Sequence, residues 1–414
     1  MSMEKTHCSF CGQPQGADVP LIAGEEGHIC EECVRLASQV VGSWGRKRAA
    51  SKPLQNLLKP AEIKEWLDQY IIGQDLAKET IAVAVYNHFK RLRMENSDPE
   101  MKLDRQEVDI EKSNILLLGP SGTGKTLLAS TLAKIVGVPF VIADATTLTQ
   151  AGYVGEDVES ILVRLMDNAE GNQELAEWGI VYIDEIDKLA RADESSHGPR
   201  DVSGEGVQQA LLKLVEGTRM KLKSQNRKDQ SAEPSIDTRN ILFIAGGAFA
   251  GLEKQLEKRF NTAQQGIGFH VDLSNKEKAY DQLRLFEEVL PDDLRHFGLI
   301  PEFIGRFPII TALHDLDEKA LVRILTEPRN ALVRQYHRLF QFEKVDLQFT
   351  PEALIAIAKQ AIERGTGARG LRGVMEGLLR KVMYDIPSQE GITACEVDED
   401  AVNKKKAIEL VMGR

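Results

Sequence analysis

Apolar residues recur with two different spacings in the main part of the chain, and the alternation between them predicts its fold class. From about residue 60, helical spacing is found in KPAEIKEWLDQY and in GQDLAKETIAVAVYNHFKRLR. Then follow four short apolar runs, NILLLG, VPFVIAD, GIVYIDE and NILFIAGG, separated by helical stretches. Strands that alternate with helices predict an α/β domain, with a parallel sheet covered by helices on both faces.

After about residue 312 the pattern becomes mostly helical, with one strand-like piece, KVDLQFT. We therefore expect a large α/β domain over 60–312 and a smaller, mainly helical C-terminal domain over 313–414. Three long polar segments, 191–206, 217–239 and 261–280, interrupt the central part. Insertions of this length are usually functional loops or disordered segments.

Bulk composition narrows the class of protein. With 414 residues, 42% of them hydrophobic and 28% charged, the chain is predicted to be a soluble globular protein of two or three domains. A net charge of −11 argues against broad, non-specific nucleic-acid binding. No apolar run approaches the length of a membrane span, and the first residues lack a signal-peptide core. We expect a cytoplasmic location, where the five cysteines are not expected to form disulfides.

Four of the cysteines form two C-x2-C pairs, Cys8 with Cys11 and Cys30 with Cys33. This spacing predicts a four-thiolate zinc site, which is closed and therefore structural; a pair of redox dithiols is the alternative. We assign the module to residues 1–41 and a short basic linker to 42–59. Between Cys8 and Cys33 there are five acidic residues and no lysine or arginine, which favours a protein-binding or dimerising module over a nucleic-acid-binding finger. The remaining cysteine, Cys395, is expected to be an inert packing residue.

A phosphate-binding pattern follows the first predicted strand. The segment GPSGTGKT at 119–126 fits G-x4-G-K-[ST], in which glycines let backbone N–H groups surround the phosphates at the start of a helix. Lys125 can reach the β and γ phosphates of ATP, and the Thr126 hydroxyl can ligate Mg²⁺. The expected nucleotide contacts are Pro120, Ser121, Gly122, Thr123, Gly124, Lys125, Thr126 and Leu127.

About sixty residues later, the apolar run IVYI ends in acids. Asp184 at the strand end is expected to hold the Mg²⁺ shell, and Glu185 to polarise the attacking water, because a carboxylate can accept its proton or hydrogen bond. Ordinary surface acids at the end of a strand are the alternative. The chain is therefore predicted to hydrolyse ATP, and these motifs do not say what the hydrolysis drives.

The P-loop, the strand-end acids and the sequences after them resemble those of the AAA+ ATPases. More narrowly, the chain resembles the ClpX-type unfoldases of the Clp/Hsp100 family. The resemblance extends over nearly the whole chain and rests on a combination of motifs: CSFC and CEEC, YIIGQ, GPSGTGKT, AGYVGEDVES, VYIDEIDK, RDVSGEGVQQALLKLVEGT, ILFIAGGAFAGL, GIGF, GLIPEFIGR and TGARGLR.

The resemblance implies a homohexameric ring and further roles at the ATP site. Ile71 and Ile72 in YIIGQ would line the adenine pocket, with plain core packing as the alternative. Arg306 in PEFIGR would reach the γ-phosphate bound by a neighbouring subunit and stabilise transition-state charge there. Arg369 in GARGLR would sense the nucleotide from the small domain. For both arginines a surface salt bridge is the alternative.

The resemblance also assigns residues to a central pore that grips protein substrates. They are Tyr153 and Val154 in a first loop, Arg200 and Asp201 in a second, and Arg227 and Lys228 in a loop at the pore entrance. The entrance loop departs from the Arg-Lys-His pattern of the family, because Asp229 stands where the family has histidine. This acid lowers the local positive charge, which bears on the recognition of substrate tails with a free carboxylate.

A polar, glycine-containing stretch, QQGIGFH, carries Ile267, Gly268 and Phe269. By itself it is compatible with buried core. The resemblance implies that this tripeptide docks into apolar clefts on a ClpP-type peptidase, where two apolar anchors on each of six loops add by avidity. The flanking Gln264, Gln265 and His270 are bulkier than the residues typical of the family.

The leading hypothesis is an ATP-dependent unfoldase that threads protein substrates through a hexameric pore and delivers them to the peptidase, with adaptor proteins contacting the zinc module. ATP, Mg²⁺ and Zn²⁺ are the expected cofactors, and neither a nucleic acid nor a membrane is expected as a partner. One alternative is a stand-alone protein-remodelling chaperone. The other is a nucleic-acid-remodelling AAA+ ATPase, against which the acidic zinc module and the net charge count.

Overall fold

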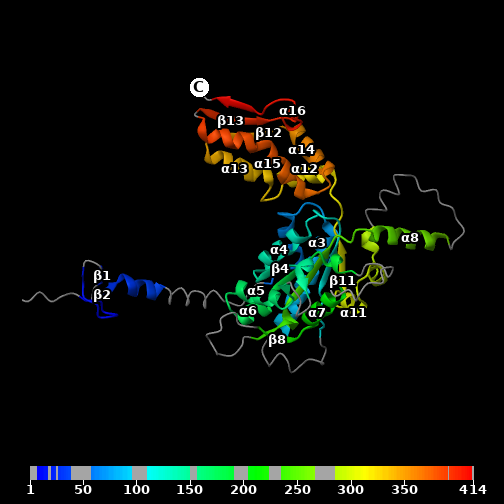
Figure 1. The fold of residues 1–414 in the computed structure, drawn as a ribbon, viewed down its shortest axis with the longest axis horizontal. Coiled ribbons are helices and arrows are strands. Elements are labelled where there is room, and N and C mark those ends of the chain that lie inside the picture. Colours follow the sequence, from blue (N-terminus) through cyan, green and yellow to red (C-terminus); the bar gives the residue numbers. More distant parts are fainter. Residues whose placement is uncertain are drawn as a thin grey trace, which may run out of the picture. The chain divides into compact units, whose positions relative to one another are not determined.

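The chain forms two compact units, residues 1–56 and 57–414. The structure is a computed structural model, and it describes residues 7–16, 20–24, 27–38, 57–95, 110–149, 156–190, 204–222, 235–265, 285–389 and 391–412. Its elements are drawn in Figure 1.

The first unit is a small antiparallel ribbon followed by a helical segment over 31–38. Strand β1 (Leu21–Ala23) pairs with β2 (His28–Cys30). Several large apolar side chains of this unit are exposed, among them Phe10, Ile22 and Leu36. Two three-residue strands bury little apolar surface, so the unit needs another source of stability.

The second unit is built on a five-stranded, all-parallel sheet in the order β11-β3-β10-β7-β4. Its strands are β3 (Ile115–Leu118), β4 (Phe140–Asp144), β7 (Ile180–Asp184), β10 (Leu242–Gly247) and β11 (Ile309–Ala312). All residues of the central strands β3 and β10 are buried. This is expected of a parallel sheet with both faces covered, and the predicted α/β fold class is confirmed.

Alternate residues of each strand point to opposite faces of the sheet, and helices cover both faces. On one side, residues such as Leu116 and Val181 join a core with α5, α7 and α8. On the other side α4 packs against β7 and β10, and α3 packs against β11. The helices of this domain are α2 (Pro60–Asp68), α3 (Asp75–Glu95), α4 (Lys125–Val136), α5 (Ser160–Asn168), α6 (Gln173–Glu177), α7 (Glu205–Glu216), α8 (Leu252–Gln265), α10 (Pro291–Phe297) and α11 (Pro301–Gly305).

Beyond β11 lies a separate core of four helices and a three-stranded sheet, ordered β12-β13-β14. The helices are α12 (Glu318–Thr326), α13 (Leu332–Phe342), α14 (Pro351–Glu363) and α15 (Ala368–Asp385), with the short α16 (Glu399–Val402). The strands are β12 (Asp346–Phe349), β13 (Ile392–Val397) and β14 (Glu409–Met412). The predicted mainly helical character is confirmed, and β12 is the strand-like piece seen in the sequence. Two further strands complete its sheet, and one of them buries Cys395.

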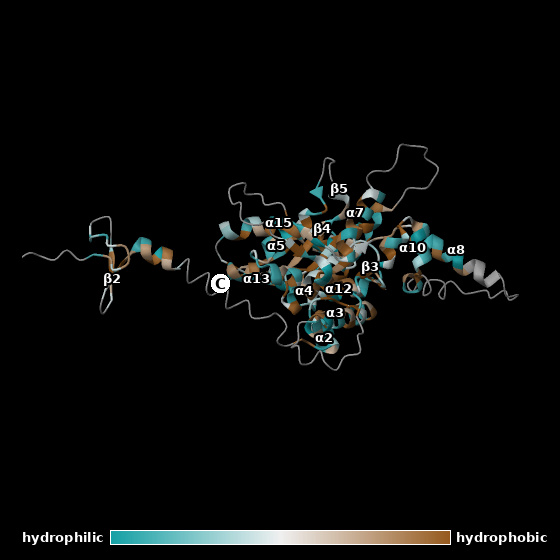
Figure 2. Cartoon of the chain, turned by 90° about the horizontal axis from the view of Figure 1, so that it is seen from below, coloured by the Kyte–Doolittle hydropathy of each residue, from teal (hydrophilic) through white to brown (hydrophobic). Residues whose placement is uncertain are grey.

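Parts of the three polar segments lie within the described residues. Residues 217–239 contain the antiparallel pair β8 (Arg219–Lys221) and β9 (Ser235–Asp237), and α8 extends through residue 265. Hydrophilic residues predominate along the described part of α8, which explains why periodicity did not reveal it (Figure 2). The short pair β5 (Leu148–Thr149) and β6 (Glu156–Asp157) brackets 150–155. No helix among the described residues is both long and apolar enough to cross a bilayer.

Candidate functional site

The phosphate-binding loop connects the buried strand β3 to α4, as the sequence predicts, and it depends on two glycines. Gly119 has a φ of 137° and Gly122 a φ of 86°, both in the region that only glycine adopts readily. A Cβ atom on Gly119 would lie 2.2 Å from the carbonyl oxygen of Leu313, and one on Gly122 would lie 2.7 Å from that of Thr366. The loop is therefore held between β3 and backbone segments from the C-terminal part of the chain.

Lys125 lies inside this loop and is 8% exposed. Its Nζ donates hydrogen bonds to the carbonyl oxygens of Gly119, at 2.6 Å, and Pro120, at 2.9 Å. Burial lowers the pKa of this ammonium group, while the charge of Asp184 opposes the change. The Lys125 ammonium group is thus held in the loop by two carbonyl oxygens, and phosphate oxygens can take the place of these two partners.

Asp184 ends β7 beside Thr126, and their side chains are in contact. The Thr126 hydroxyl donates to Oδ2 of Asp184 at 2.9 Å. Two donors meet the other oxygen, Oδ1: the Glu185 backbone N–H at 3.0 Å and the hydroxyl of Tyr182 at 3.2 Å. A hydroxyl beside a carboxylate offers the hard oxygen ligands that Mg²⁺ prefers, so the two residues fit a magnesium shell. Sequence reasoning missed Tyr182, whose only signal is its position two residues before Asp184.

Glu185 adopts a left-handed backbone conformation, with φ 55° and ψ 35°. A non-glycine residue in this region is costly and is found preferentially at functional sites. The turn ends the strand directly after Asp184, and Asp184 and Glu185 both line the cleft described below. Such an arrangement allows one carboxylate to serve a metal ion while the other faces a water molecule.

These groups line one cleft of about 570 Å³. It contains most of the predicted nucleotide contacts together with several residues that sequence reasoning did not select. One of them, Asp187, is buried, and its Oδ1 accepts the N–H of Ala248 at 3.1 Å, which fixes the end of β10 at the floor of the cleft. The lining residues are Ser121, Gly122, Gly124, Lys125, Thr126, Leu127, Asp184, Glu185, Asp187, Lys188, Gly247, Ala248, Ala368 and Arg369.

Arg369, in the first turn of α15, is among the residues that line this cleft. Its Nη1 lies 3.4 Å from Oγ of Ser121. The preceding segment contacts the loop backbone too, because Thr366 lies against Gly122. The small C-terminal domain thus contributes a cation to the phosphate-binding side of the cleft.

Arg306 does not line the cleft. It follows α11, and its Nη2 pairs with Oε1 of Glu216 at 2.9 Å. Its backbone carbonyl accepts a hydrogen bond from Asn114 at 2.8 Å. The side chain is half exposed, and Arg306 is not among the residues that line the cleft.

Ile71 and Ile72 are buried and are not among the residues that line the cleft. The segment that carries them is held to the rest of the unit by Gln74, whose amide group donates to the carbonyl of His314 and accepts its N–H, both at 2.8 Å. Contact of the two isoleucines with adenine stays a prediction. The pore residues Tyr153, Val154, Arg200, Asp201, Arg227 and Lys228 and the docking residues Ile267, Gly268 and Phe269 lie outside the described residues.

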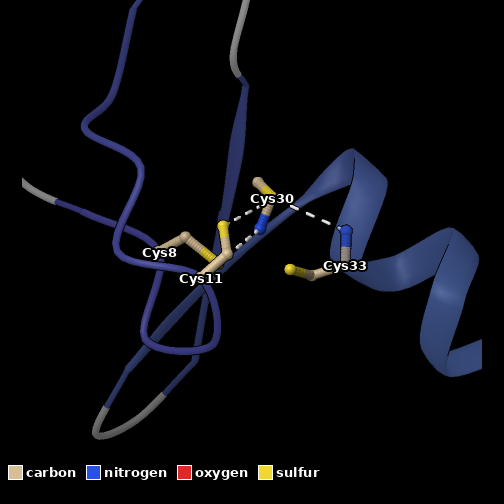
Figure 3. Close-up of side chains that lie close together, drawn as sticks. All are labelled: Cys8, Cys11, Cys30 and Cys33. Carbon is tan, nitrogen blue, oxygen red and sulfur yellow. Dashed lines mark hydrogen bonds between the residues drawn. The ribbon is translucent and has the colours of Figure 1, made fainter.

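The first unit gathers its four cysteines at one point (Figure 3). Cys8 and Cys11 come from the opening loop, Cys30 ends β2 and Cys33 lies in the helical segment that follows. The four sulfur atoms all lie within 4.8 Å of one another, and those of Cys11 and Cys30 are 3.6 Å apart. Tetrahedral zinc at Zn–S distances of about 2.3 Å requires sulfur atoms about 3.8 Å apart, so the cluster fits the ion.

The electrostatics of the four thiols also favour a bound metal cation. Desolvation raises the pKa of Cys8, but backbone N–H groups of Cys11, Phe10 and Cys30 outweigh it and lower that pKa to about 6. Contact with Cys11 and desolvation raise the pKa of Cys33 to about 12. Four adjacent thiols cannot all ionise without a cation, and Zn²⁺ supplies the compensating charge. By contrast, burial raises the pKa of the isolated Cys395 to about 11, which leaves it an unreactive thiol.

Four features define the class of AAA+ ATPases: the parallel sheet, the P-loop after β3, the two acids at the end of β7, and a helical domain that contributes Arg369 to the same cleft. Comparison with protein-family models agrees. The AAA domain (Cdc48 subfamily) matches residues 110–310, the C-terminal D2-small domain of ClpB protein matches 316–398, and the ClpX C4-type zinc finger matches 6–42.

Curated relatives identify the family. The chain is 59% identical over 410 residues to the ATP-dependent Clp protease ATP-binding subunit ClpX 3 of Methylococcus capsulatus, covering 98% of this chain and 94% of that one. It is 56% identical over 396 residues to the ATP-dependent Clp protease ATP-binding subunit ClpX of Azotobacter vinelandii, covering 95% and 89%. The chain belongs to the ClpX family. The predicted ATPase activity and the predicted cofactors, ATP, Mg²⁺ and Zn²⁺, are thereby confirmed.

Proposed function

We propose that this chain is one subunit of a homohexameric, ATP-driven unfoldase that threads protein substrates through its central pore into a ClpP-type peptidase. Membership of the ClpX family supports this function, since both relatives are named as ATP-binding subunits of a Clp protease. The observation that supports a ring of subunits is the position of Arg306 outside the cleft. The cleft holds the P-loop, two acids and Arg369, and Arg306 is not among its lining residues. A neighbouring subunit would therefore supply the arginine that completes each site.

Within each site, the chain's own residues divide the work. Lys125 and the loop N–H groups bind the phosphates, Thr126 and Asp184 hold the magnesium ion, and Glu185 accepts a hydrogen bond from the attacking water. The bound ion neutralises charge on the phosphate oxygens. Arg369 links phosphate occupancy to the position of the small domain, because it reaches the loop from α15.

The elements beside the proposed pore and docking loops support their assignment. Helix α7 begins directly after 191–203, the pair β8–β9 brackets 223–234, and α8 ends at residue 265, just before Ile267. Each loop thus starts or ends on a regular element of the ATPase domain, through which nucleotide-dependent movement can be passed on. The exposed apolar side chains of the zinc module, Phe10, Ile22 and Leu36, are suited to contact adaptors or substrates.

Mixing two inactive variants tests the shared site. Glu185→Gln and Arg306→Ala subunits are each expected to lose ATP hydrolysis. In mixed rings, an Arg306→Ala subunit retains Glu185 and can receive Arg306 from a Glu185→Gln neighbour, so part of the activity should return. If mixed rings stay as inactive as either parent, Arg306 does not act across the interface.

A second experiment tests peptidase docking. Phe269→Ala is expected to abolish degradation of a fluorescent protein substrate in the presence of ClpP, while ATP hydrolysis and unfolding of the same substrate persist. Degradation at the normal rate would exclude the tripeptide from the docking role.

A separate measurement tests the alternative function. Stimulation of ATP hydrolysis by single-stranded DNA, but not by unfolded protein, would favour a nucleic-acid-remodelling function.

A further inference from the structure

Tyr182 lies in β7 with its side chain completely buried, two residues before Asp184. Because alternate residues of a strand share a face, both side chains lie on the side of the sheet that α4 covers. The phenol hydroxyl donates to Oδ1 of Asp184 at 3.2 Å. A core residue of the sheet is therefore joined directly to the carboxylate at the strand end.

The neighbouring strand leaves room for this hydroxyl. Gly246 in β10 lies beside the phenol, and a Cβ atom there would be 2.2 Å from the tyrosine oxygen. Any other residue at position 246 would displace the ring. Glycine in a strand interior often marks such a close approach.

The hydroxyl is a hydrogen-bond donor to this carboxylate, and the buried ring and the space beside Gly246 hold it in place. A protonated phenol beside an ionised carboxylate makes a charge-assisted hydrogen bond, which is stronger than one between neutral groups.

The two oxygens of Asp184 have different partners. Oδ1 accepts from Tyr182 and from the Glu185 backbone, while Oδ2 accepts from the Thr126 hydroxyl. Without the phenol, Oδ1 would keep only the backbone bond, from the next residue in the chain. The phenol donates a second hydrogen bond to Oδ1 from a different direction. This bond limits rotation of the carboxylate and leaves Oδ2 facing the P-loop.

We propose that Tyr182 is a positioning residue for magnesium, whose hydroxyl fixes the rotation of the Asp184 carboxylate so that Oδ2 faces Thr126 and the metal shell. This inference rests on the proposed role of Asp184 in holding the ion. Hydrogen-bond partners behind a metal ligand orient it, and losing one typically lowers metal affinity about 10–100-fold.

The test uses the full-length Tyr182→Phe variant, which removes one oxygen atom and keeps the ring that packs in the sheet. Mn²⁺, as a probe of the magnesium site, is titrated at saturating ADP, and free Mn²⁺ is measured by electron paramagnetic resonance without turnover. We expect the dissociation constant to rise about tenfold. The Mg²⁺ concentration that half-saturates ATP hydrolysis should rise by a similar factor, and excess Mg²⁺ should recover the lost rate.

Tyr336→Phe is the matched control, because it removes a buried phenol oxygen from the core of the small domain. Its Mn²⁺ dissociation constant should equal that of the unmodified chain. An equally unchanged constant in Tyr182→Phe, with a weakened one in Asp184→Asn, would overturn the positioning role alone. Unchanged Mn²⁺ binding in Asp184→Asn would overturn the proposed magnesium role of Asp184 itself.

Discussion

Four sulfur atoms gather the cysteine module around one point, whereas a covered five-stranded sheet carries the nucleotide site. The module has two three-residue strands and leaves Phe10, Ile22 and Leu36 exposed. The ATPase domain buries every residue of β3 and β10. A short segment cannot bury enough apolar surface to fold alone, so it needs a metal ion, while a large domain can position its reactive groups by packing.

Removing zinc is expected to have the largest effect, and to affect only one of the two regions. A structural zinc site contributes on the order of 10–16 kcal/mol to folding. Cys8→Ser should therefore lose zinc and unfold the module, seen as rapid proteolysis near the N-terminus, while ATP hydrolysis continues. Cys395→Ala is the control and should keep its zinc. An inactive ATPase after zinc loss would show that the two regions are not independent.

Next in size is the effect of Glu185→Gln on turnover. Loss of a general base typically lowers the rate by about 10²–10⁴-fold, and ATP binding should remain because the P-loop is intact. Binding of a fluorescent ATP analogue and steady-state hydrolysis measure the two properties separately. Glu170→Gln makes the same change at another left-handed glutamate, one that does not line the cleft, and should be neutral. Normal hydrolysis in Glu185→Gln would exclude the proposed role.

Gly119→Ala tests how far the nucleotide site depends on close backbone packing. The new Cβ would meet the Leu313 carbonyl at 2.2 Å, in a backbone region costly for alanine. We expect the free energy of unfolding of the ATPase domain to fall by roughly 3 kcal/mol, measured by urea denaturation. Gly377→Ala, where no atom lies within 4 Å of the new Cβ, should be neutral or stabilising. Equal stability of the two variants would contradict the packing argument.

The smallest expected effect near neutral pH is a loss of stability through His88, which lies in the half of α3 away from the YIIGQ segment. Burial, reinforced by the charges of Arg91 and Lys112, lowers the pKa of His88 from 6.5 to about 3. Between these values the unfolded chain binds a proton at this group and the folded chain does not. Stability should therefore fall as the pH drops from 6.5 towards 3, by about 1.4 kcal/mol per pH unit. In His88→Gln this contribution to the slope should disappear; an unchanged slope would contradict the burial argument.

Features confined to neighbouring residues could be predicted from the sequence. The C-x2-C pairs, the P-loop and the acids after IVYI are each defined by a few residues that are close together in the sequence. They can therefore be recognised without knowing how distant parts of the chain pack. The spacing of apolar runs likewise indicated the parallel sheet and the helical C-terminal part. The edge strand β11 was missed because its run, IITA, is less uniformly apolar than the ILLL of β3, which has the same length. It becomes a strand by pairing with β3, almost two hundred residues earlier.

By itself, then, the sequence determined which short motifs the chain contains, namely the cysteine pairs, the P-loop and the acids after IVYI, and the order of the helices and strands that carry them. Only the tertiary structure decided which distant groups meet: Arg369 approaches Ser121, Arg306 pairs with Glu216, and Gln74 binds both backbone groups of His314. It also decided that the Tyr182 hydroxyl reaches Asp184 through space left by Gly246. The physical reason is that these contacts depend on how strands and helices pack, and packing distances are not encoded in any single stretch of residues.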